Sequence, residues 1–82
     1  MSLDKDSQAE CERIIQLLKE EREKRGLSKY AVAQQSGLSQ QAIGYIENGL
    51  RYPSLETVLR IAKAMDVDLS KIIKRAQREL SK

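Results

Sequence analysis

The sequence predicts an all-α fold, a compact domain of five helices. Apolar residues recur at helical spacing in five segments, a Ser or Asp suited to helix capping precedes each, and no segment alternates as a β-strand does. A chain of 82 residues with 40% hydrophobic and 33% charged residues can bury one small core. We therefore expect a single domain, residues 7–82, after a polar segment, residues 1–6, that is disordered or derives from an expression tag.

The first helix is expected to run from Ser7 to about Arg25. Ser7 and Glu10 have the spacing of a capping box, in which each side chain accepts a backbone N–H of the other. Gly26 ends the helix. Its apolar residues share one face, which is expected to pack in the core: Cys11, Ile14, Ile15 and Leu18.

Residues 28–47 predict two short helices joined by a sharp turn. The small Ala33 suits the point where the second helix crosses the first. Gly37 supplies the positive φ that ends the first helix, and the hydroxyl of Ser39 caps the second. These features predict a helix-turn-helix motif at residues 28–47.

The second helix of the motif, residues 39–48, has a divided surface. Ile43 and Ile46 point toward the core. The opposite face carries two amides, a phenol and one bare backbone position: Gln41, Asn48, Tyr45 and Gly44. Such groups can hydrogen-bond base edges and phosphates in a DNA major groove, so we expect this helix to bind DNA.

Two more helices follow a connector, residues 50–53. Ser54 caps the fourth helix and Asp68 the fifth, in which Ile72 is expected to be buried. The fourth helix has an apolar stripe that should face the core: Leu55, Val58, Leu59, Ala62 and Met65. The fifth helix carries apolar residues that are expected to extend beyond the core and to pair two copies of the chain: Ile73, Ala76 and Leu80.

Composition argues against several classes of function. With one cysteine, Cys11, and no histidine, the chain cannot form an internal disulfide, an ordinary zinc site or a His-activated nucleophile. We therefore expect no enzyme activity, metal or cofactor. Because no membrane-spanning or signal segment is apparent, the expected location is the cytoplasm.

The net charge of +3 is unevenly distributed. The proposed DNA-binding helix contains no Lys or Arg, so its contacts with bases would be neutral. Contacts with phosphates must then come from flanking cations such as Lys29 and Arg51. A single domain of this kind should bind DNA weakly.

The order and spacing of residues from Ile14 to Ile73 resemble the phage-repressor and Cro-type helix-turn-helix family, often called Xre-like regulators. The resemblance implies a lambda-repressor-like fold and a DNA-binding function. It is carried by Arg-Gly-Leu-Ser at 25–28, Ala33, Gly37, Leu38-Ser39, the run Ile-Gly-Tyr-Ile-Glu-Asn-Gly at 43–49, Pro-Ser-Leu-Glu-Thr at 53–57 and Ile-Ala-Lys-Ala at 61–64.

The resemblance also implies roles for individual residues. Arg22 matches an arginine that commonly pairs with the glutamate closing the DNA-binding helix, here Glu47. The expected base-reading residues are Gln40, Gln41, Gly44 and Tyr45. The expected contacts with the DNA backbone are Lys29, Tyr30, Ser39, Asn48, Arg51 and Tyr52. For the three tyrosines the alternative is a purely structural covering role, and Gly44 indicates either close approach to DNA or a helix completed only on binding.

The expected function is sequence-specific transcriptional regulation, by a repressor that docks residues 39–48 in the major groove of a palindromic operator. Palindromic sites require a homodimer, expected to form through the fifth helix. A free-standing repressor, a restriction-modification controller and an antitoxin with a protein partner remain open. The alternative from another class is a protein-interaction module of the same fold.

Overall fold

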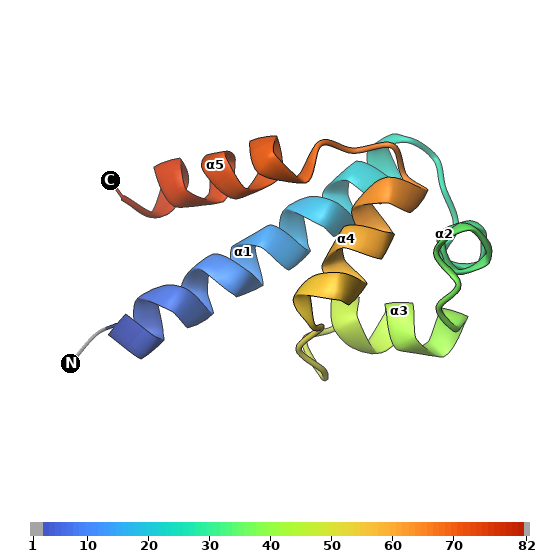
Figure 1. Ribbon diagram of the computed structural model, residues 1–82, viewed down its shortest axis with the longest axis horizontal. Helices are drawn as coiled ribbons and strands as arrows, with labels where there is room; N and C mark the ends of the chain where they lie inside the picture. Colours follow the sequence, from blue (N-terminus) through green and yellow to red (C-terminus); the bar gives the residue numbers. More distant parts are fainter. Residues whose placement is uncertain (1–2, 82) are drawn as a thin grey trace.

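The computed structural model describes residues 3–81, and all regular structure in that range is helical. Its five helices are α1 (Leu3–Lys24), α2 (Lys29–Ser36), α3 (Gln40–Glu47), α4 (Leu55–Ala64) and α5 (Leu69–Leu80). In Figure 1, α1 and α5 lie side by side and antiparallel, and α2, α3 and α4 gather around the C-terminal half of α1. The predicted all-α fold of five helices is confirmed.

Side-chain caps begin α2 to α5 at the four predicted positions. The hydroxyls of Ser28, Ser39 and Ser54 each accept the backbone N–H three residues further on, at 3.0, 3.0 and 3.1 Å. The carboxylate of Asp68 accepts the N–H of Ser70 at 3.0 Å and the Ser70 hydroxyl at 2.6 Å, and these bonds, the hydroxyl bond first, lower the pKa of Asp68. Each such cap stabilises its helix by about 1 kcal/mol, so the four starting points are fixed locally.

The predicted start of α1 is wrong. The helix begins at Leu3 and passes through Ser7, so Ser7 is not its cap. Residues 3–6, expected to be disordered, form the first turn of α1, whereas residues 1–2 of that expected segment lie outside the described residues. A serine cap is a local preference of about 1 kcal/mol, which packing of α1 along α5 can override.

The core lies where all five helices meet. Leu17, Val32 and Ile43 are the largest fully buried side chains, and the predicted core positions Ala33 and Ile46 are also buried. Within residues 6–81, the buried apolar residues are Ile15, Leu17, Leu18, Val32, Ala33, Ile43, Ile46, Ile61, Ala62, Met65, Ile72 and Ala76.

Two parts of the predicted core are wrong because the buried faces of the helices are rotated from their expected positions. The buried residues at α4 are Ile61, Ala62 and Met65. Leu55 and Leu59, which were expected in the core, are 70% and 39% exposed. On α1 Leu17 is buried, whereas Cys11 is exposed. Each helix offered more apolar residues than one face could bury.

The expected apolar surface on α5 is also corrected. Ile72 is buried, as predicted, but Ala76 is fully buried too and cannot contribute to an exposed patch. The middle of α1 lies along this part of α5, where Glu10 contacts Gln77 and Arg13 contacts Glu79. Leu80 remains 45% exposed and Ile73 is partly exposed.

An ion pair joins the middle of α1 to the C-terminal end of α5. Arg13 Nε donates to Glu79 Oε1 at 2.6 Å, and Arg75 Nε donates to Glu79 Oε2 at 2.9 Å. These two guanidinium groups, Arg13 first, lower the pKa of the Glu79 carboxyl to about 2. On the same pair of helices, Gln77 Nε2 donates to Glu10 Oε1 at 3.4 Å.

The Glu79 pair should make stability depend on acid pH. A carboxyl whose pKa is lower in the folded state stabilises above its unfolded pKa, near 4.5, and this stabilisation is lost as pH falls toward about 2. We expect Glu79→Gln to flatten the decline of unfolding free energy in that window, measured by urea denaturation. Glu56→Gln, which changes an exposed surface carboxylate, is the control; equal slopes for wild type and Glu79→Gln would contradict the expectation.

Candidate nucleic-acid interface

The helix-turn-helix motif places α3 on the outside of the molecule. Gly37, with φ +77°, ends α2, and its N–H donates to Ala33 O at 3.0 Å. Two residues later the Ser39 cap starts α3 in a new direction. Figure 1 shows α3 along the lower edge and α5 along the upper edge, with α1 between them.

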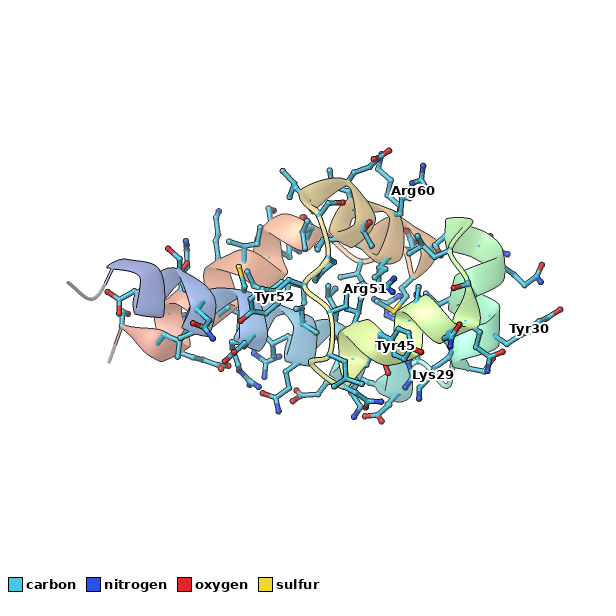
Figure 2. The ribbon with its side chains drawn as sticks, turned by 90° about the horizontal axis from the view of Figure 1, so that it is seen from below. Lys29, Tyr30, Tyr45, Arg51, Tyr52 and Arg60 are labelled. Carbon is cyan, nitrogen blue, oxygen red and sulfur yellow. The ribbon has the colours of Figure 1, made fainter. Side chains whose placement is uncertain are left out.

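The two faces of α3 differ as predicted. Ile43 and Ile46 are 1% and 4% exposed, whereas the side chains of Gln40 and Gln41 are open to solvent. Tyr45 is half-buried, and its ring and hydroxyl still reach the surface that α3 presents in Figure 2. The outer face of α3 therefore consists of neutral hydrogen-bonding groups.

A chain of contacts orders part of this face. The guanidinium carbon of Arg51 lies 5.3 Å from the centre of the Tyr45 ring, within the range of a cation–π interaction. Gln41 Nε2 in turn donates to the Tyr45 hydroxyl at 2.7 Å. The connector after α3 thus supports Tyr45, and Tyr45 holds the amide of Gln41.

The hydrogen bond to Tyr45 leaves Gln41 able to read a base. A glutamine amide has two N–H donors and one carbonyl acceptor, and Tyr45 uses only one donor. The remaining N–H and the oxygen match the N7 acceptor and the N6 donor of adenine.

The residues expected to contact the DNA backbone are not all gathered in one place. In Figure 2, Lys29, Tyr45 and Arg51 are seen on the α3 side of the molecule. Tyr30 projects from the outer end of α2, and Tyr52 lies toward α1.

Three of the residues expected to contact the DNA backbone are Ser39, Asn48 and Tyr52, and their hydrogen bonds and exposure are as follows. The side-chain oxygen of Ser39 accepts its cap bond, which leaves its O–H free to donate, and Asn48 is exposed. The Tyr52 hydroxyl donates to Glu12 Oε2 at 3.0 Å. Desolvation and the Glu12 carboxylate raise the pKa of Tyr52, so its phenol stays protonated.

The expected ion pair between Arg22 and Glu47 is present and buried. Arg22 Nε donates to Glu47 Oε2 at 2.7 Å and Nη2 donates to Oε1 at 2.9 Å, with the side chains 11% and 9% exposed. Arg22 Nη1 donates to Leu27 O at 2.7 Å, and the bond to Glu47 raises the pKa of the guanidinium. One side chain thereby joins α1, the turn before α2 and the end of α3.

Gly44 has no packing role within the protein. A Cβ added there would meet no other atom within 4 Å, and α3 is continuous through this position. The idea of a helix completed only on binding therefore finds no support in the fold of α3. Packing within the protein therefore gives no reason for a glycine, which costs a helix about 1 kcal/mol relative to alanine.

Sequence reasoning missed the contacts that organise this face. Arg51 with Tyr45, and Tyr52 with Glu12, join residues from different elements. Tyr52 and Glu12 are 40 positions apart, so no periodicity or motif relates them.

The geometry agrees with the comparison with known families. A family profile described as helix-turn-helix, HTH_3, matches residues 18–72. The chain belongs to this helix-turn-helix family. The predicted family and the lambda-repressor-like fold are thus confirmed.

Comparison with solved structures gives a clear relative. The high-resolution crystal structure of the restriction-modification controller protein C.AhdI from Aeromonas hydrophila has 35% sequence identity to this helix-turn-helix protein and a TM-score of 0.68. The match covers 73% of this chain and 91% of that one. Comparison with curated protein sequences finds no significant match.

Membership in this family makes the chain a DNA-binding helix-turn-helix regulator and not an enzyme. Within residues 3–81, no His, Cys, Asp and Glu side chains are grouped to hold a metal ion. None of the helices in that range is both long and apolar enough to cross a bilayer.

The Arg22–Glu47 pair should be strongly coupled in stability. We expect Arg22→Met and Glu47→Gln each to lower the unfolding free energy by about 3 kcal/mol, because each leaves the other group buried without its partner. The double variant should lose at least about 1 kcal/mol less than the sum, in chemical denaturation.

The exposed pair of Arg60 and Glu56, at 3.3 Å, serves as the control for this cycle and should show coupling of only about 0.3–0.5 kcal/mol. Additive losses at Arg22 and Glu47 would mean that their contact does not stabilise the fold.

Proposed function

We propose that this chain is a sequence-specific transcriptional repressor that docks residues 39–48 in the major groove of a palindromic operator. The observation that carries the proposal is the outer face of α3, where exposed amides stand beside a supported phenol. Such groups can hydrogen-bond base edges in the major groove. The family to which the chain belongs supports the same reading.

The proposed contacts divide into two kinds. Gln40, Gln41, Gly44 and Tyr45 on α3 would meet bases, and the Tyr45 hydroxyl would hold Gln41 in place for an adenine. Lys29 and Arg51 at the edges of α3 would meet phosphates and set the register. Because α3 itself has no cation, specificity and electrostatic affinity would come from different residues.

Among the regulators that the sequence left open, the similarity to C.AhdI favours a restriction-modification controller. A regulator that acts by occupying sites on DNA needs no catalytic site. The cytoplasm, where such DNA is found, is the proposed location. An antitoxin with a protein partner, or a module that binds only protein, would lack the sequence-dependent DNA binding tested below.

We further propose that the functional unit is a homodimer, because one such domain meets too few base pairs for useful specificity. With Ala76 buried, the supporting surface is an apolar groove of about 290 Å³ between α1, the connector and α5. Leu55, Leu69 and Ile73 line this groove, and Leu55 is 70% exposed. In the proposed dimer α5 still contributes Ile73, and Leu55 of α4 takes the place expected for Ala76.

Glutamine substitutions test base reading on an operator selected from a random DNA pool. We expect Gln40→Ala and Gln41→Ala each to weaken operator binding by about 1–3 kcal/mol and to leave binding to random duplex nearly unchanged. Gln77→Ala, an exposed glutamine on α5, is the matched control and should change neither affinity. Equal losses on operator and random DNA would assign both side chains to non-specific contact, and no binding at low salt would reject the function.

Sedimentation at tens of micromolar protein tests the dimer. We expect Leu55→Lys to shift the wild-type dimer to monomer, because a charge would be buried in the apolar groove. Leu50→Lys alters a leucine that is similarly exposed, at 73%, but does not line the groove, and should leave the dimer intact. A monomeric wild type would contradict the proposal.

A further inference from the structure

One carboxylate lies beside the residues proposed to bind the DNA backbone. Glu12 Oε2 accepts two hydrogen bonds, from the Tyr52 hydroxyl at 3.0 Å and from Gln8 Nε2 at 3.3 Å. Gln8 and Glu12 belong to the N-terminal half of α1, and Tyr52 belongs to the connector between α3 and α4. This contact links the start of α1 to the connector beside α3.

The contact lies in an open polar groove of about 480 Å³ between α1 and the end of α3. Asn48 and Tyr52, two of the residues expected to contact phosphate, line this groove together with Gly49. Glu12 and Gln8 line it from α1. A sugar-phosphate segment bound by Asn48 and Tyr52 would therefore lie beside Glu12.

While Tyr52 donates its hydroxyl hydrogen to Glu12, it cannot donate to a second acceptor. A tyrosine hydroxyl has one hydrogen, and Tyr52 donates it to Glu12. Phosphate oxygens only accept hydrogen bonds, so Tyr52 cannot donate to DNA while Glu12 holds it. The carboxylate occupies the place of a phosphate oxygen and also repels an approaching phosphate by its charge.

Glu12 lies outside the segment of the chain that matches the family profile. The family profile begins at residue 18, so Glu12 and Gln8 lie outside the matched segment, whereas Tyr52 and Asn48 lie inside it. The carboxylate is thus carried by the additional turns of α1, which α5 holds in place through Arg13 and Glu79.

We propose that Glu12 is an internal competitor for a DNA phosphate at Tyr52, and that it lowers the affinity of this domain for the DNA backbone irrespective of sequence. This inference rests on the proposed DNA-binding function. Weaker backbone binding matters for a regulator, because abundant non-specific DNA competes for the protein.

The test measures binding to a random-sequence duplex at low salt by fluorescence anisotropy, with the whole chain. We expect Glu12→Ala to bind about threefold to tenfold more tightly than wild type, the value of one freed hydrogen bond. Glu10→Ala is the matched control, since it makes the same change on the same helix where the carboxylate faces Gln77 of α5. It should reproduce only the smaller gain from net charge.

Tyr52→Phe separates the freed hydroxyl from the removed charge. In wild type this change should alter affinity by less than about twofold, because the hydroxyl is already engaged by Glu12. In the Glu12→Ala background it should return affinity to that of Glu10→Ala. Circular dichroism of every variant should match wild type.

Two results would overturn the inference while leaving the proposed function intact. Equal gains for Glu12→Ala and Glu10→Ala would show a general charge effect. Equal losses from Tyr52→Phe in wild type and in Glu12→Ala would show that Tyr52 binds DNA regardless of Glu12. If neither wild type nor any variant binds the duplex at low salt, the proposed function itself fails, and this inference with it.

Discussion

The orientation of α3 depends on the buried pairing of Arg22 with Glu47. Two hydrogen bonds fix the guanidinium to the carboxylate, and a third fixes it to Leu27 O. Buried charges tolerate little displacement, because each must keep its partner in a medium of low dielectric. Ile43 and Ile46 add apolar packing beneath α3. The ion pair and this packing together set the angle at which the outer face of α3 meets solvent.

Different parts of the fold contribute to stability and to the outer face of α3. The long helices α1 and α5 supply length and electrostatic contacts away from α3, and the inner side of α3 supplies part of the core. The outer side of α3 keeps groups that the fold does not need. Arg51 is the link between these parts, since it belongs to the connector and yet lies over the ring of Tyr45.

How much of this could be predicted from sequence depends on the range of each interaction. Caps such as Ser39 and turns such as Gly37 act within a few residues, so their positions were predicted correctly. The choice of Ile61 over Leu59 for the core, and the earlier start of α1, depend on how helices pack together. The interface divides in the same way: its helix follows from local patterns and family resemblance, whereas its internal contacts join distant segments and its DNA partners lie outside the chain.

The open space around Gly44 means that the fold does not determine which side chain stands at this position. Because no protein atom stands where a side chain at this position would begin, the fold places no steric limit on what occupies it. Under the proposed docking of α3, a replacement at this position would change the surface that meets the DNA without requiring a compensating change in the core.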